Sequence, residues 1–141
     1  MKGLSNRLQT ALDLLPVCCC VADVGCDHGI ATLALLRQGK CQRVLACDIS
    51  APSLEKARKR LTQAGLAEKA SFECCDGLER AQQADGALLL GMGGRAIVDI
   101  LQRARAQIPF MRGLVVGPAS HLELLYEWLP TLGLRVENET I

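Results

Sequence analysis

The chain has 141 residues, a formal net charge of +1, and apolar side chains at half of its positions. This length suits one domain and is too short for two comfortable ones. The balanced charge argues against binding that rests on bulk basicity, although a local basic face could still serve RNA. No stretch reaches the roughly 18 apolar residues of a membrane helix. Because Asp13 and polar neighbours interrupt the start, no signal peptide is predicted, and we expect a cytoplasmic protein.

The first half of the chain alternates between helical and strand-like patterns. Leucines at helical spacing predict a helix that begins at Leu4 and ends before Pro16. The continuous apolar run that follows is typical of a strand buried on both faces. Glycines suit the ends of the next two helices, where a left-handed residue is common. The predicted elements are a strand at 18–24, a helix at 30–38 before Gly39, a strand at 43–50 and a helix within 50–66 that Gly65 ends.

The second half continues the alternation. Ser120 and Glu123 predict a capping box, with Ser120 as the N-cap of a helix that Pro130 ends or kinks. The other predicted elements are strands at 70–77, 84–94, 112–119 and 134–140, and a helix whose inward residues lie within 97–104. Because strand and helix alternate, the connections must be crossovers. We therefore expect one α/β domain over residues 1–141, with a doubly wound, mostly parallel Rossmann-like sheet of about six strands and helices on both faces.

Unusual loop residues follow four successive strands of the predicted sheet. In doubly wound sheets, ligands bind at the carboxyl ends of the strands, so these residues are expected to share one site. Each group alone is weak evidence, whereas their joint placement is stronger. They are Asp23, Gly25, Cys26, Asp27, His28 and Gly29 after the first strand, Asp48 after the second, Asp76 and Gly77 after the third, and Gly91, Met92, Gly93 and Gly94 after the fourth.

These residues suit a cofactor that contains adenosine. Gly25 and Gly29 would let the backbone approach a ligand closely. A carboxylate at the end of the second strand, here Asp48, commonly binds the ribose hydroxyls. Asp76 could accept a hydrogen bond from the exocyclic amine of adenine. Simpler interpretations remain open: the glycines could form only a tight turn, Asp48 could cap the following helix, and Asp76 could be a turn residue.

The charge of the first loop discriminates between two cofactors. The pyrophosphate of NAD requires a helix N-terminus and a G-x-G-x-x-G turn. This loop instead carries two acids, Asp23 and Asp27, which repel a diphosphate and suit a cation. S-adenosylmethionine carries a sulfonium and an ammonium and no phosphate, so the charge favours S-adenosylmethionine.

The remaining chemical candidates are weaker. The eight cysteines include no CxxC pair and mostly lie in apolar runs, so we expect reduced structural thiols and no metal site. His28 could be a packed or an exposed histidine, and direct catalysis by it is not expected. The basic run at 56–60 is expected to be a solvated helix face rather than an RNA track. Arg95 is better placed, at the start of the helix that follows the fourth strand.

The segments "VADVGCDHG", "LEKARKRLTQAGL" and "LLGMGGRAIVDIL" resemble the bacterial tRNA adenine-N1 methyltransferases that modify position 22 of tRNA. "LSNRL" near the start and "HLELLYEWL" near the end fit the same pattern, so the resemblance covers nearly the whole chain. It implies a methyltransferase that uses S-adenosylmethionine and acts on tRNA. The implied cofactor residues are Asp23, Gly25, Asp48, Asp76, Gly77 and Gly91, and we expect Cys26, Gly29, Ile49 and Met92 to contribute to the same cofactor site. The resemblance also suggests that Asp27 and His28 belong to the working loop, with Asp27 beside the methyl-transfer point. We expect His28, Arg95 and Pro118 to contact the substrate.

The chemistry of this reaction agrees with the loops. Adenine N1 has a free lone pair, and its methylated product is cationic, so the enzyme needs alignment and a nearby negative charge. Asp27 could supply that charge or accept a hydrogen bond from the adenine amine. Enzymes that methylate exocyclic amines often carry an Asn/Asp-Pro-Pro-aromatic motif after the fourth strand. Here the segment is Gly91-Met92-Gly93-Gly94, which favours a ring nitrogen as the target.

The chain departs from the family in two ways. The family usually has a Gln-Pro-Asn-like turn after the fifth strand, where this chain has Gly117-Pro118-Ala119-Ser120. Family members also continue past Ile141 with a closing strand or hairpin and a helical region that helps to grip tRNA. We expect that region to be absent here, which leaves open a cofactor-binding remnant without turnover. Two further alternatives are a methyltransferase for a small molecule and a nicotinamide-dependent oxidoreductase. The sequence does not indicate the oligomeric state.

Overall fold

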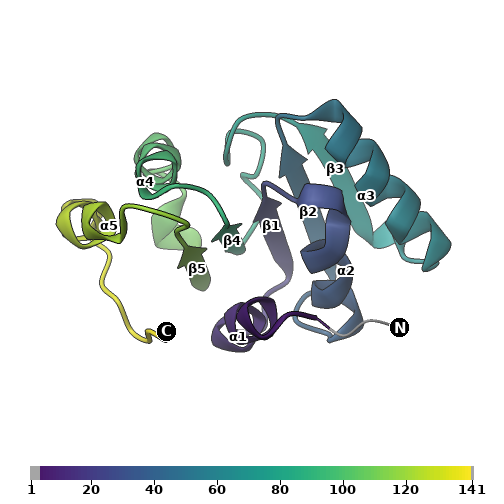
Figure 1. Cartoon of the computed structure of the whole chain (residues 1–141), viewed down its shortest axis with the longest axis horizontal. Coiled ribbons are helices and arrows are strands. Elements are labelled where there is room, and N and C mark those ends of the chain that lie inside the picture. The colour runs from purple at the N-terminus through teal and green to yellow at the C-terminus, as the bar shows by residue number, and fades with distance from the viewer. Residues whose placement is uncertain (1–3, 141) are drawn as a thin grey trace.

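The computed structural model describes residues 4–140. Its centre is a parallel sheet of five strands in the order β3-β2-β1-β4-β5 (Figure 1). The strands are β1 (Cys20–Val24), β2 (Arg43–Asp48), β3 (Ala70–Cys74), β4 (Gly86–Leu90) and β5 (Gly113–Gly117). The helices are α1 (Asn6–Leu14), α2 (Ile30–Arg37), α3 (Ala51–Gln63), α4 (Gly94–Arg103) and α5 (Leu122–Trp128). The predicted doubly wound Rossmann-like class is confirmed, with five strands instead of six.

Strand β1 is the central strand, and every one of its residues is buried. It pairs with β2 on one side and β4 on the other, so that Ala22 lies between Leu45 and Ala87. The continuous apolar run that predicted a doubly covered strand is thereby explained, since helices lie on both faces of this strand.

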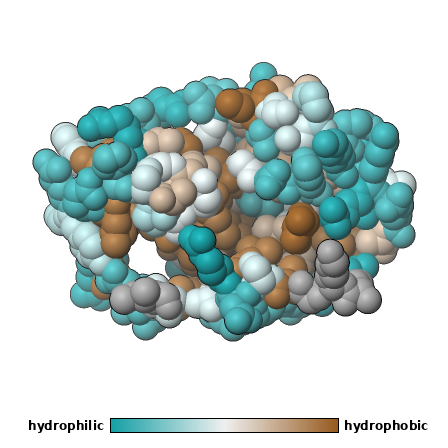
Figure 2. Space-filling view, in the orientation of Figure 1, coloured by the Kyte–Doolittle hydropathy of each residue, from teal (hydrophilic) through white to brown (hydrophobic). Residues whose placement is uncertain are grey.

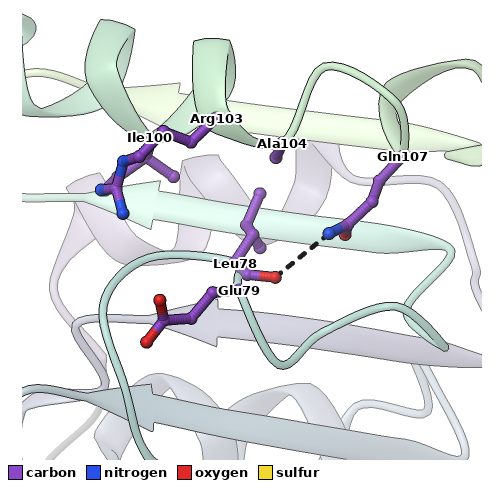
Figure 3. A pocket seen from close by; sticks show the side chains of 6 residues that line it. All are labelled: Leu78, Glu79, Ile100, Arg103, Ala104 and Gln107. Carbon is purple, nitrogen blue, oxygen red and sulfur yellow. Dashed lines mark hydrogen bonds between the residues drawn. The ribbon is translucent and has the colours of Figure 1, made fainter.

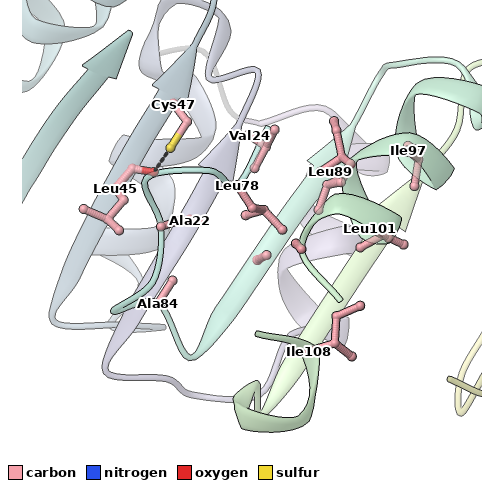
Figure 4. Packing of buried hydrophobic residues seen from close by; sticks show 14 of the residues in the cluster. Ala22, Val24, Leu45, Cys47, Leu78, Ala84, Leu89, Ile97, Leu101 and Ile108 are labelled. Atoms are coloured by element: carbon pink, nitrogen blue, oxygen red, sulfur yellow. Dashed lines mark hydrogen bonds between the residues drawn. The ribbon is translucent and has the colours of Figure 1, made fainter. Parts of the chain in front are cut away.

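Two apolar cores lie on opposite faces of the sheet. On one face, Val21 and Val44 pack with Leu12 of α1 and Leu35 of α2, and Ala46 packs with Leu54 and other residues of α3. On the other face, the residues drawn in Figure 4 form one cluster, to which the strands, α4 and the segment that follows β3 all contribute. They include Ala22, Leu45, Leu78, Leu89, Ile97 and Leu101. Figure 1 shows α4 and α5 on the opposite side of the sheet from α2 and α3.

The helix ends follow the local sequence signals. Ser5 and Ser50 are the N-caps of α1 and α3, and each side chain accepts a hydrogen bond from a backbone N–H. Gly39 and Gly65 follow the C-caps of α2 and α3 with φ of +68° and +73°, a conformation that glycine adopts without steric cost. α5 ends at Trp128, and a 3₁₀ turn at Leu129–Leu132 contains Pro130, as the predicted stop requires.

Two predictions near the end of the chain are wrong. Residues 134–140 form no strand, because within residues 4–140 no neighbouring strand pairs with them. Ser120 is not the N-cap of α5: that position is His121, with φ of 54° and no side-chain capping bond. Ser120 instead forms a bridge to Gly93, and its carbonyl accepts the N–H of Gly94 at 2.8 Å. This tertiary pairing outweighs the local capping preference.

Candidate cofactor and substrate site

The loop between β1 and α2 has an uncommon backbone. Gly25, Asp27, His28 and Gly29 all have positive φ, at 72°, 33°, 62° and 80°. A positive φ is costly for Asp27 and His28, about 1–2 kcal/mol each, because the Cβ approaches the following carbonyl. Such strain, held by surrounding structure, is typical of functional loops.

The carboxylate of Asp48 joins this loop to the end of β2. Its Oδ2 accepts the N–H of Asp27 at 3.4 Å, and its Oδ1 accepts the N–H of Ser50 at 2.9 Å. Ser50, rather than Asp48, supplies the N-cap of α3. The alternative role of Asp48 as a cap is therefore not observed. The carboxylate is left at the carboxyl edge of the sheet, beside the loop.

Asp23 lies underneath the loop, and its side chain is almost completely buried. Asp23 and Thr32 are the two buried polar side chains among residues 4–140, with exposed fractions of 4% and 0%. They bind each other: Thr32 Oγ1 donates to Asp23 Oδ2 at 2.6 Å. Burial raises the pKa of Asp23 from 3.8 to about 6, the nearby charges of Asp48 and Asp27 add to this shift, and the Thr32 hydrogen bond opposes it. The Asp23 carboxylate thus lies buried below the loop rather than on its open side.

Asp27 and His28 stand at the open side of the loop. The Asp27 side chain is 86% exposed, the His28 side chain 43%, and their Oδ1 and Nε2 atoms lie 3.8 Å apart. Arg60 of α3 donates from Nε to the carbonyl of His28 at 2.9 Å. His28 is therefore exposed rather than packed in the core, and the loop is tied to α3.

Gly29 has a structural reason to be glycine. A Cβ at this position would lie 2.9 Å from the Cα and Cβ of Ala57, in the middle of α3. This close packing of loop against helix accounts for glycine at position 29 by itself. Gly25 differs, since its added Cβ would meet only the methyl end of Met92 at 3.4 Å, which brings the loops after β1 and β4 together.

An exposed apolar side chain, Ile49, and a further carboxylate, that of Asp76, follow along the same edge of the sheet. Ile49 is 76% exposed although it is large and apolar. The N–H of Cys75 donates to the carbonyl of Asp48 at 3.1 Å, which holds the ends of β2 and β3 together. Asp76 is exposed, and its Oδ1 accepts from Arg103 Nη2 at 3.2 Å. Next to it, Gly77 is buried with φ of +62° and packs against Ile100.

The glycine-rich segment after β4 docks on the end of β5 through its backbone. Gly91 donates to the carbonyl of Gly117 at 2.9 Å, and the Met92 carbonyl accepts the N–H of Ala119 at 2.9 Å. A Cβ on Gly94 would lie 2.2 Å from the carbonyl oxygen of His121. The space around Gly91 is open, with nothing within 4 Å of an added Cβ.

The structure brings the predicted residues to the carboxyl edge of the sheet, and Pro118 and Arg95 lie at the periphery of this group. Half-buried Pro118 follows β5 beside the segment that contains Met92, and Arg95 is exposed in the first turn of α4. Cys26 is buried, and burial raises the pKa of its thiol to about 12, so the thiol is neutral at pH 7. All eight cysteines are free. Among residues 4–140, no group of His, Cys, Asp or Glu side chains could hold a metal ion, and no helix is long and apolar enough to cross a membrane.

A hollow of about 190 Å³ lies beside this edge, between α4 and the segment after β3 (Figure 3). Gln107 points across it and donates from Nε2 to the carbonyl of Leu78 at 3.2 Å. Arg103, which holds Asp76, also lines it. Arg103 therefore connects the lining of this hollow to Asp76.

Sequence reasoning missed three residues that organise the site: Thr32, Arg60 and Arg103. Thr32 carried a signal, because it is the one polar residue in the apolar run 30–36. Arg60 and Arg103 carried none, because their partners are 32 and 27 residues away in the chain.

The site fits a cationic adenosine compound. Asp23, Asp27 and Asp48 converge on the loop after β1, and among the described residues none of them pairs with a lysine or arginine. Exposed Ile49 offers an apolar surface to a ligand. The space beside Gly91 is open, and a Cβ at this position would take up part of it. Such a set repels phosphate and offers an uncompensated negative charge to a cation.

The sheet order, the glycine loop after β1 and the acids after β2 and β3 define a Rossmann-like α/β protein of the nucleotide-cofactor-binding class. The chain belongs to the methyltransferase domain family, whose family model matches residues 4–141. The methyltransferase part of the resemblance seen in the sequence motifs is thereby confirmed.

Individual relatives agree with this membership. The tRNA (adenine(22)-N(1))-methyltransferase of Bacillus subtilis is 30% identical over 128 residues, which are 89% of this chain and 54% of that protein. A Streptococcus agalactiae protein of the NADB-Rossmann superfamily superposes with a TM-score of 0.89 at 29% identity, over 97% of this chain and 62% of that one. A Streptococcus pneumoniae protein in complex with S-adenosyl-L-methionine gives a TM-score of 0.90 at 26% identity, over 98% of this chain and 66% of that one. The chain spans about half the length of the Bacillus enzyme.

Proposed function

We propose that this chain binds S-adenosylmethionine at the carboxyl ends of β1, β2 and β3 and transfers its methyl group to N1 of an adenine in tRNA. The bound cofactor supplies an electrophilic methyl group on a sulfonium. The similar proteins from Bacillus and Streptococcus support both the cofactor and the tRNA substrate. A tRNA substrate also agrees with the cytoplasmic location expected from the sequence.

The observation that carries the cofactor assignment is that the carboxylates of Asp23, Asp27 and Asp48 lie around one loop with no lysine or arginine partner among the described residues. Asp27 and Asp48 are joined through a backbone N–H, and Asp23 lies beneath them with a pKa of about 6. The negative charges of Asp48 and Asp27 repel the buried Asp23 carboxylate and add to the rise of its pKa. A sulfonium and an ammonium would relieve that repulsion, whereas a diphosphate would increase it.

The adenosine half of the cofactor has a defined set of residues. Asp48 would accept hydrogen bonds from the ribose hydroxyls, and Ile49 would cover one face of the adenine. Arg103 occupies Oδ1 of Asp76, which leaves Oδ2 without a partner among the described residues and able to accept from the adenine amine. Gly77 and Gly91 would line the opposite side.

The acceptor base would enter beside Asp27. Adenine N1 needs no general base, since its lone pair is free, so the protein's task is to align the base and stabilise the developing positive charge. The exposed carboxylate of Asp27 can do the latter. The segment Gly91-Met92-Gly93-Gly94 pairs through its backbone with the end of β5 and offers no polar side chain to hold an exocyclic amine, which supports a ring nitrogen as target. His28, Arg95 and Pro118 would contact the RNA.

The test is methyl transfer from labelled S-adenosylmethionine to unmodified tRNA transcripts that carry either adenine or guanine at position 22. We expect label in the adenine transcript alone, located as 1-methyladenosine after digestion to nucleosides. Label in both transcripts would reject the position, and label recovered as N6-methyladenosine would reject the ring nitrogen. If the cofactor binds and neither transcript is labelled, the chain is a cofactor-binding remnant or acts on another substrate.

A further inference from the structure

Positive charge is concentrated on one helix next to the site. Within α3, four of five consecutive residues are Lys56, Arg58, Lys59 and Arg60, and Glu55 is the single acid of that helix. All four basic side chains are exposed, whereas the whole chain carries a net charge of only +1. Figure 2 shows hydrophilic residues over the side of the molecule that α3 forms.

These four cations differ in what they contact. Arg58 lies 3.7 Å from Glu55 and stacks over the ring of Phe72 on β3, 4.7 Å from its centroid, so it covers the sheet. Lys56, Lys59 and Arg60 lie at i, i+3 and i+4 and therefore share a different face of the helix. Among the described residues, Lys56 and Lys59 have no ion-pair or hydrogen-bond partner.

The face formed by Lys56, Lys59 and Arg60, which we call the α3 basic face, adjoins the loop that holds Asp27. Gly29 packs directly on Ala57 of α3, and Arg60 reaches the carbonyl of His28 at 2.9 Å. Helix α3 starts at Ala51, shortly after Asp48, whose carboxylate accepts the N–H of Asp27. A lysine one turn before Arg60 therefore lies nearer the carboxyl edge of the sheet, where the cofactor would bind.

An RNA substrate faces opposing charges at this edge. The carboxylates of Asp23, Asp27 and Asp48 favour a cationic cofactor and repel phosphates, so they cannot draw in a nucleic acid. A base can approach Asp27 only if its phosphates pass over a positive surface nearby. We propose that the α3 basic face is that surface, and that Lys56 and Lys59 bind phosphates of the tRNA backbone while the target adenine lies beside Asp27. This rests on the proposed function, and it assigns to the 56–60 run more than the solvated face expected from the sequence.

The experiment compares two variants that lose the same charge. Lys56→Gln/Lys59→Gln removes two unpartnered cations from the α3 basic face. Arg7→Gln/Lys69→Gln is the control, because both residues are exposed, Arg7 lies on α1, and Lys69 lies at the amino end of β3. The dissociation constant of an unmodified tRNA transcript is measured over a series of salt concentrations, and that of S-adenosylmethionine by calorimetry.

We expect the α3 variant to bind tRNA about tenfold more weakly at moderate salt, and the control within twofold of wild type. The slope of log affinity against log salt should fall by about 2 in the α3 variant, because each phosphate contact contributes roughly 0.9. Affinity for S-adenosylmethionine should be unchanged in both. Equal weakening by the two variants, or none in the α3 variant, would overturn the inference alone. A wild-type chain that binds S-adenosylmethionine and no tRNA would overturn the proposed function as well.

Discussion

At the scale of single residues, the buried carboxylate of Asp23 lowers the stability of the fold. Asp23 is 4% exposed, and within residues 4–140 Thr32 is the one side chain that donates a hydrogen bond to its carboxylate. A carboxylate held there is expensive, because burial disfavours its charged form. The pKa of about 6 records that expense. A negative charge is kept in the protein interior at the place where a cationic cofactor would use it.

Asp23→Asn makes this cost measurable. The folded-state pKa is raised from 3.8 to about 6, so ionisation destabilises the fold. The cost is absent below about pH 3.8, grows as the pH rises towards 6, and is complete above that. A shift of this size corresponds to roughly 3 kcal/mol. The stability of Asp23→Asn relative to wild type should therefore rise by up to about 3 kcal/mol between acidic and neutral pH, measured by urea unfolding. A difference that stays constant with pH would show that the Asp23 pKa is ordinary.

Asp27 is predicted to act on the reaction rather than on the fold. Its side chain is 86% exposed, so Asp27→Ala should change the free energy of unfolding little. Because Asp23 and Asp48 remain to face the cofactor, the affinity for S-adenosylmethionine should stay within about twofold of wild type. Methyl transfer should fall about a hundredfold, the usual effect of removing one electrostatic contact to a transition state. Asp99→Ala is a matched control, since Asp99 is an exposed acid on α4. Turnover of Asp27→Ala close to that of the control would remove Asp27 from the mechanism.

At the scale of elements, the loop after β1 is held in place by its neighbours. α3 packs against it at Gly29, Arg60 binds the carbonyl of His28, and Asp48 binds the N–H of Asp27. These contacts maintain two non-glycine residues at positive φ. The loop and α3 therefore act as one unit, and damage to their contact should reach the cofactor.

Gly29→Ala tests this unit against a control with the same backbone. At Gly29 an added Cβ combines positive φ with a 2.9 Å approach to Ala57, whereas at Gly39 the φ is similar and nothing lies within 4 Å. Gly39→Ala should cost about 1–2 kcal/mol from conformation alone. Gly29→Ala should cost about 3 kcal/mol or more through added overpacking, and it should also weaken S-adenosylmethionine binding. Equal costs in thermal unfolding would show that the α3 contact yields without strain.

His28→Gly should have the opposite sign. Glycine at φ of 62° avoids the steric cost that His28 bears, so the free energy of unfolding should rise by about 1 kcal/mol. Transfer to tRNA should fall, because an exposed ring at the acceptor side is lost. Chemical denaturation and a turnover assay give the two readings. A destabilised His28→Gly would mean that the ring contributes more to the fold than its backbone costs.

At the scale of the whole molecule, sequence reasoning succeeds where the signal is local. The alternation of apolar runs fixes the doubly wound class, and Gly39 and Gly65 mark helix ends that the structure reproduces. The placement of four loops at one edge follows from parallel topology alone. The positions of Asp27, Asp48 and Ile49 at this edge can therefore be predicted from the sequence.

Sequence reasoning fails where the local structure depends on a residue that is distant in the chain. Residues 134–140 have a strand-like pattern, yet a strand needs a neighbouring strand, and none pairs with them in the described part of the chain. Ser120 has a capping sequence, but its backbone is used by Gly93 and Gly94. The pairing of Asp76 with Arg103 and of Asp23 with Thr32 likewise depends on the fold.

The central claim is that acids at the first crossover accept a cationic methyl donor and reject a diphosphate. Calorimetric titration of the chain with S-adenosylmethionine and, separately, with NAD tests it most directly. We predict saturable binding of S-adenosylmethionine at a single site and no measurable heat with NAD. Saturable binding of NAD together with no binding of S-adenosylmethionine would contradict the account.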